Sequence, residues 1–155
     1  MQHNSKIAGI LNDLIMINKD RTEGYEKAIN ELDKADVDLQ ALYQQYAQQS
    51  RMYATQLSQE VSKLGEEAAT GTTTSGKIYR TWMSMKSAFS SNERKSTLEA
   101  CEYGEDAAQK AYKEALSISS DLPASLAKLI SRQQAELRSA HDTIRRQRDK
   151  QEAVK

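Results

Sequence analysis

The sequence has few of the residues that break helices or cross-link a chain. Among its 155 residues it has one cysteine, one proline and six glycines. A single cysteine excludes a framework of disulfides within the chain. Because glycine and proline are the poorest helix formers, their scarcity favours an all-α fold. Cys101 falls on an apolar helix face, and we therefore expect a buried, unreactive thiol there.

The chain also lacks an excess of either charge and lacks a long apolar run. Lys plus Arg and Asp plus Glu are both 22, which gives a formal net charge of zero. That balance argues against a nucleic-acid partner, because such binding draws on a strongly basic surface. No apolar stretch approaches the ~20 residues that a membrane-spanning helix needs, so we expect no membrane partner. The first six residues carry no apolar signal region, and we expect a cytoplasmic protein.

What the sequence does contain is a repeated helical pattern. Apolar side chains recur at steps of three and four residues through four long segments, a spacing that places them on one face of a helix. A shorter segment has Ile78, Trp82, Met85 and Phe89 at the same spacing and predicts a short additional helix. We expect a single domain over residues 1–155, with helices at about 5–33, 37–64, 77–89 (the short one), 93–119 and 122–149.

The connections predict how these helices are ordered. Two are short, as in antiparallel helical hairpins, whereas the connection between the second and third long helices has about 28 residues and can run the length of a bundle. A long second connection lets the third long helix lie parallel to the second, which is the arrangement of ferritin-like four-helix bundles. We expect the short helix of this crossover to lie against the bundle. Alternatively, Trp82 and Met85 form a surface for a protein partner.

Polar residues interrupt the apolar stripes at about the same height on all four long helices. A charged side chain on a buried face needs a partner or a ligand. We therefore predict a polar layer across the core, in which Arg21 pairs with Glu105, and Asn18, Gln133, Ser50 and tyrosine hydroxyls complete the hydrogen bonds. The predicted layer consists of Asn18, Arg21, Ser50, Glu105, Gln133 and His141.

A metal site is the alternative for the same layer. Ferritin-like di-iron sites take a Glu from each of two helices and a Glu-x-x-His pair from each of the other two. In this chain the position three residues before His141 is Arg138, and residues 48–52 of the second helix offer neither Glu nor His. A guanidinium in the layer also repels a cation. The ligands that remain for iron or another divalent metal are Glu102, Glu105 and His141.

Several short segments together carry a resemblance that covers about residues 7–149. They are NDLI at 12–15, DRTEGY at 20–25, RTW at 80–82, EYGEDAA at 102–108 and AHDTIR at 140–145. In combination they resemble a bacterial family of ferritin-like four-helix-bundle proteins of unknown function that is discussed with stress response. The resemblance implies a ferritin-like fold in a bacterial cytosolic protein, and it implies no established activity.

These observations lead to three hypotheses of function. We expect a non-enzymatic structural or interaction protein, related to stress and without a cofactor, that forms a homodimer or binds a protein partner. The first alternative is a metal-binding or redox bundle that uses Glu105 and His141. The second is a helical adaptor that docks a partner on Trp82.

Overall fold

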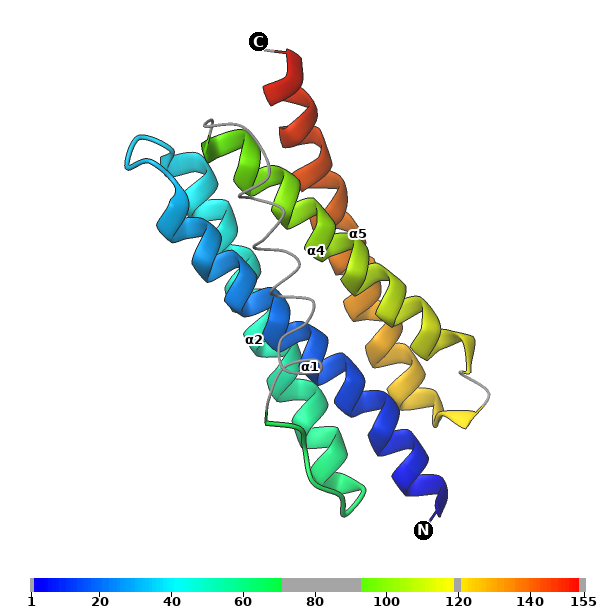
Figure 1. Cartoon of the computed structure of the whole chain (residues 1–155). Helices are drawn as coiled ribbons and strands as arrows, with labels where there is room; N and C mark the ends of the chain where they lie inside the picture. Colours follow the sequence, from blue (N-terminus) through cyan, green and yellow to red (C-terminus); the bar gives the residue numbers. More distant parts are fainter. Residues whose placement is uncertain (1, 71–92, 119–120, 154–155) are drawn as a thin grey trace.

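Four long helices make up most of the chain (Figure 1). The computed structural model describes residues 2–70, 93–118 and 121–153. The helices are α1 (Gln2–Glu31), α2 (Val37–Lys63), α4 (Glu93–Ser117) and α5 (Ala124–Ala153), and the described ranges contain no strand. The all-α prediction is therefore confirmed, with predicted bounds that differ by at most four residues from those observed. The predicted short helix at 77–89, with Trp82 and Met85, lies outside the described residues.

Local sequence signals account for two of the helix ends. Gly65 has a φ of 78°, a left-handed conformation that favours glycine, and it follows directly on the last turn of α2. The amides of Gly65 and Glu66 donate to the carbonyls of Ser62 and Val61, at 3.0 and 3.3 Å, which satisfies acceptors at the helix end. Pro123 precedes α5, where its missing N–H costs no hydrogen bond.

The helices follow the order that the sequence predicts for a ferritin-like bundle. In Figure 1, α1 and α2 form an antiparallel hairpin, and α4 begins at the end of the bundle where α2 begins. Arg94 of α4 contacts Asp36 and Asp38 at that end, with Nη2 of Arg94 2.6 Å from Asp38. At the opposite end Lys6 of α1 pairs with Asp121, just before α5, at 2.9 Å. Consequently α4 runs parallel to α2, and α5 runs parallel to α1.

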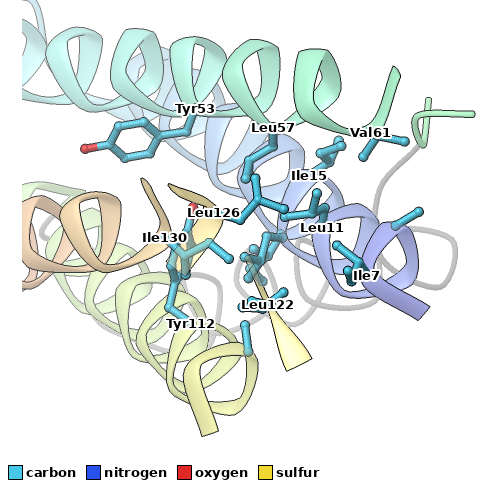
Figure 2. Close-up of a cluster of buried hydrophobic side chains, with 14 of the residues drawn as sticks. Ile7, Leu11, Ile15, Tyr53, Leu57, Val61, Tyr112, Leu122, Leu126 and Ile130 are labelled. Atoms are coloured by element: carbon cyan, nitrogen blue, oxygen red, sulfur yellow. The ribbon is translucent and has the colours of Figure 1, made fainter. Parts of the chain in front are cut away.

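The interior consists of two clusters of buried apolar side chains. Figure 2 shows the first, in which residues of α1, α2 and α5 such as Leu11, Leu57 and Ile130 pack together. The second contains several aromatic rings and also the buried Cys101. Members of this second cluster include Tyr25, Tyr43, Tyr46, Leu98 and Ile144. Burial of these side chains supplies the main driving force for folding.

Polar side chains occupy the place where the two apolar clusters meet. Along α1, Ile17 belongs to the first cluster and Tyr25 to the second, with Arg21 midway between them. Along α2 and α4, Ser50 and Glu105 occupy the corresponding positions, and all three polar residues are buried. The fold therefore brings them to one level of the bundle.

The beginning of the long connection is tied to α1. The side-chain amide of Asn12 donates to the carbonyl of Glu67 at 3.1 Å, and its oxygen accepts from the backbone amide of Ala69 at 2.8 Å. Asn4 and Ser5 make further hydrogen bonds to Leu64 and Glu66. These contacts lay residues 64–69 back along the first half of α1, because Asn12 lies about two turns beyond Ser5.

Candidate functional site

Arg21 is the cation at the centre of the bundle. Its side chain is 1% exposed. The guanidinium donates from Nε and Nη2 to the same oxygen of Glu105, at 3.0 and 2.7 Å. Its Nη1 donates to the hydroxyl of Ser50 at 2.7 Å and to the carbonyl of Tyr46 at 3.1 Å. One side chain of α1 thereby links α2 with α4.

The surroundings of Arg21 keep it charged. Burial by itself lowers the pKa of Arg21, but the charge of Glu105 and its hydrogen bonds outweigh burial and raise that pKa above its ordinary value. The rings of Tyr25 and Tyr46 lie 5.2 and 5.4 Å from the guanidinium carbon, which adds cation–π attraction. The pair with Glu105 is therefore an ion pair out of contact with water.

Glu105 is fully buried on α4 and uses its two oxygens unequally. One oxygen, Oε2, accepts both hydrogen bonds of Arg21 and a third from the hydroxyl of Tyr25. The other, Oε1, has no hydrogen-bond donor among the residues that the structure describes. Burial and the neighbouring charge of Glu105 raise the pKa of Tyr25, so its hydroxyl keeps its proton and remains a donor.

A chain of neutral side chains continues the polar layer across the bundle. The hydroxyl of Ser50 donates to the oxygen of Asn18 at 2.9 Å, and the amide nitrogen of Asn18 donates to the hydroxyl of Tyr112 at 2.9 Å. Tyr112 in turn donates to Gln133 of α5 at 2.7 Å. Gln133 then donates to Gln56 of α2 at 3.0 Å. All four helices are thus joined through their interior.

This layer constrains how the helices pack. A buried polar group that loses its partner costs free energy, so sliding one helix by a turn would leave several such groups unpaired. The apolar clusters on either side could tolerate that shift more readily, because dispersion contacts are not directional. We infer that the layer fixes the register of the four helices relative to one another.

The prediction that His141 belongs to the layer is wrong. Its side chain lies on the outer side of α5, where Nε2 is 2.6 Å from Asp106 of α4 and Nδ1 is 3.3 Å from Asp142. On a helical wheel His141 sits about 60° from the line of Leu137 and Ile144, at the edge of the apolar face. A residue at that edge can turn either way, and the two carboxylates draw it outward.

The three alternative metal ligands are also not brought together. Glu105 pairs with Arg21, Glu102 pairs with Arg148, and His141 lies with Asp106. No group of three His, Cys, Asp or Glu side chains among the described residues is arranged to hold a metal ion. At the centre of the bundle a single carboxylate faces a guanidinium. This donor set does not fit a di-iron centre, which needs several carboxylates and histidines.

Several partners in the layer were not predicted by residue. Tyr25, Tyr46 and Tyr112 fall on the apolar stripes of their helices, so periodicity treats them as core residues. Tyr25 and Tyr112 join the layer through their hydroxyl groups, which the sequence predicted only as a class, and Tyr46 joins it through its carbonyl and its ring. Gln56 lies beside the stripe of α2, and neither it nor Asn12 carries a signal that a single sequence reveals.

No helix in the described part of the chain is both long enough and apolar enough to cross a membrane.

Comparisons with known proteins agree with this architecture. Among solved structures, a mutant of Dps1 from Mycobacterium smegmatis superposes with a TM-score of 0.81, covering 95% of this chain and 97% of that one. The two are 15% identical, so the likeness shows a shared ferritin-like fold.

No curated protein matches the chain. Residues 6–117, well over half of the chain, match the family described as domain of unknown function DUF2383. The chain therefore belongs to the DUF2383 family and has a ferritin-like four-helix fold.

Proposed function

We propose that this protein is a non-enzymatic member of the ferritin-like bundles, with a structural or interaction role. The observation that carries the proposal is the ion pair of Arg21 and Glu105 at the level where such bundles hold di-iron. The guanidinium supplies the positive charge that balances the buried carboxylate. Its planar fork also provides directed hydrogen bonds that hold α1, α2 and α4 in register.

Accessibility supports a structural role for the layer. The side chains of Arg21 and Glu105 are 1% and 0% exposed, so a substrate in solution does not reach them. Asn18, Ser50 and Gln133 are buried as well, and each is hydrogen-bonded to another member of the layer. A catalytic group needs contact with its substrate, and none of these five residues offers it.

We further propose that copies of the chain associate and that the protein serves a stress-related role in the bacterial cytoplasm. Its formal net charge of zero removes the long-range repulsion that keeps strongly charged proteins apart. The stress-related role rests on the family resemblance alone. Light scattering coupled to gel filtration tests the first part: a monomer at high concentration would remove self-association from the proposal.

Metal loading tests the central part of the proposal. The protein is purified aerobically from cells grown with added iron, manganese or zinc, and metal per chain is measured by elemental analysis. We expect well under one metal ion per chain, with no change in Glu105→Ala or His141→Gln. The second variant matters because His141 pairs with Asp106 and takes no part in the central polar layer, so that layer keeps all its members. One or two ions per chain, lost in either variant, would favour a metal-binding or redox bundle instead.

A further inference from the structure

The outer face of α4 and α5 carries a groove that the central polar layer does not explain. It has a volume of about 700 Å³. Side chains of both helices form it, and several of them are basic: Lys110, Lys113, Arg138 and Arg145. Its walls are α4 and α5, two adjacent helices that the polar layer joins from within through Tyr112 and Gln133. The groove therefore lies on a rigid part of the fold.

Three of these cations lie at neighbouring levels along the bundle axis. The contact of Asp106 with His141 aligns the two antiparallel helices at that level. We count the rise of about 1.5 Å per residue along each helix from this contact. On that count, three side chains lie within about 6 Å of one another along the bundle axis: Arg138, Lys110 and Lys113. Arg145 lies on the other side of the His141 contact. We call Arg138, Lys110 and Lys113 the basic cradle.

Several arginines of the protein have their charge balanced by an ion pair, whereas the cradle residues do not in the part of the chain that the structure describes. Arg21, Arg51, Arg94 and Arg148 each pair with a carboxylate. Within the described ranges no carboxylate forms an ion pair with a cradle residue.

The carboxylates of the groove leave the cradle with an excess of positive charge. Asp106 and Asp142 face His141. Glu114 also lines the groove, about one turn along α4 from Lys110. The whole lining has four Lys or Arg side chains and three carboxylates, an excess of one positive charge apart from His141.

We propose that the basic cradle binds an anion that carries two or three linked phosphate groups. A guanidinium matches the oxygens of a phosphate through two parallel hydrogen bonds, and two lysines add point charges beside it. Three cations spread over about 6 Å along the axis, roughly one helical turn, suit several linked phosphates better than one. Gln109 and Gln134, which lie between the cations in the same groove, add amide groups that can donate to further oxygens.

Calorimetric titration with inorganic triphosphate, at low salt, tests the proposal. The groove variant combines Lys110→Gln with Arg138→Gln. The control combines Lys128→Gln with Arg132→Gln, which removes the same charge from exposed positions of α5 outside the groove. We expect the groove variant to weaken binding at least about tenfold and the control to change it less than about twofold, because screened charges act mainly at short range. Orthophosphate should bind at least about tenfold more weakly than triphosphate, since it engages fewer cations.

Backbone amide shifts in the intact protein give a second readout that depends on no variant. With triphosphate, the shifts should concentrate at residues 109–114 and 134–139. Equal losses in the two double variants, shifts centred elsewhere, or no binding at millimolar triphosphate would each overturn the proposal. A peptide of four aspartates that binds as tightly as triphosphate would also overturn it, because the site would then select negative charge and not phosphate.

Discussion

Arg21 and Glu105 meet in the middle of the bundle through a single carboxylate oxygen, which accepts from Nε at 3.0 Å and from Nη2 at 2.7 Å. Side by side on one oxygen, these two bonds leave Oε1 of Glu105 without a donor among the described residues. The pair is nevertheless strongly held, because both side chains are buried and each neutralises the other.

Removing the carboxylate should destabilise the protein strongly. Glu105→Leu leaves the guanidinium of Arg21 buried and unpaired, which should lower the free energy of unfolding by ~3 kcal/mol or more. The double variant Arg21→Met with Glu105→Leu should recover much of that loss, since no buried charge remains. Urea melts measure both. An unchanged midpoint in Glu105→Leu would show that the pair contributes nothing to stability.

The hydroxyl of Tyr112 should contribute to the stability of the protein through its two hydrogen bonds. Tyr112→Phe keeps the ring but leaves the amide nitrogen of Asn18 and the oxygen of Gln133 each short of a partner. We expect a loss of about 1–3 kcal/mol in thermal or urea unfolding. Tyr103→Phe is the matched control, because Tyr103 is half-buried on the same helix and takes no part in the layer. Equal effects of the two changes would argue against the hydrogen-bond chain.

The contact of His141 with α4 should make stability depend on pH. Burial lowers the pKa of His141, but hydrogen bonds and charge from Asp142 and Asp106 outweigh it and raise that pKa above 6.5. Because the pKa of His141 is raised in the folded state, its contact with Asp106 stabilises the fold fully below about pH 6.5. This stabilisation is lost as the pH rises through the pKa of His141 in the folded protein.

The stability difference between wild type and His141→Gln should therefore be larger at about pH 5.5 than at about pH 8.5. An NMR titration of the ring protons reports the pKa directly. Asp106→Asn should lower it, because one of the two neighbouring charges is removed. A difference in stability that is constant across this range would contradict the assignment.

Asn12 should hold the start of the crossover against α1. Asn12→Ala removes both the donor to Glu67 and the acceptor for the amide of Ala69. We expect faster hydrogen exchange at Ala69 and a loss of about 1–2 kcal/mol, as two modest hydrogen bonds disappear. Asn30→Ala, at an exposed position near the other end of α1, serves as the control. Unchanged protection at Ala69 would show that other contacts place this segment.

Hydrophobic periodicity predicted the four long helices, and the lengths of the connections predicted their order. Each long helix carries a stripe of apolar residues along most of its length and few residues that would stop it, so its existence was predictable and its ends were found within four residues. The long connection predicted that α4 runs parallel to α2, because no short loop could join helices in that arrangement. Arg21, Glu105, Ser50, Asn18 and Gln133 were also predictable as a buried set, since each lies well inside its stripe.

For residues at the edges of the apolar stripes, periodicity could not predict which partner the side chain contacts. On a helical wheel His141 lies nearer the middle of its apolar face than Gln56 does, yet His141 turns outward to Asp106 while Gln56 reaches Gln133. The choice depends on which polar group the neighbouring helix presents at that height. Residue spacing within one helix carries no information about that neighbour.

By itself, then, the amino-acid sequence determined the lengths of the helices, their buried faces and the presence of a buried opposite charge on α1 and α4. Only the tertiary structure decided that one carboxylate oxygen takes both bonds of Arg21, which tyrosine hydroxyls complete the layer and that His141 lies outside it. The physical reason is that burial follows from the periodicity of a single helix, whereas hydrogen bonds require a donor and an acceptor from different helices to meet within about 3 Å.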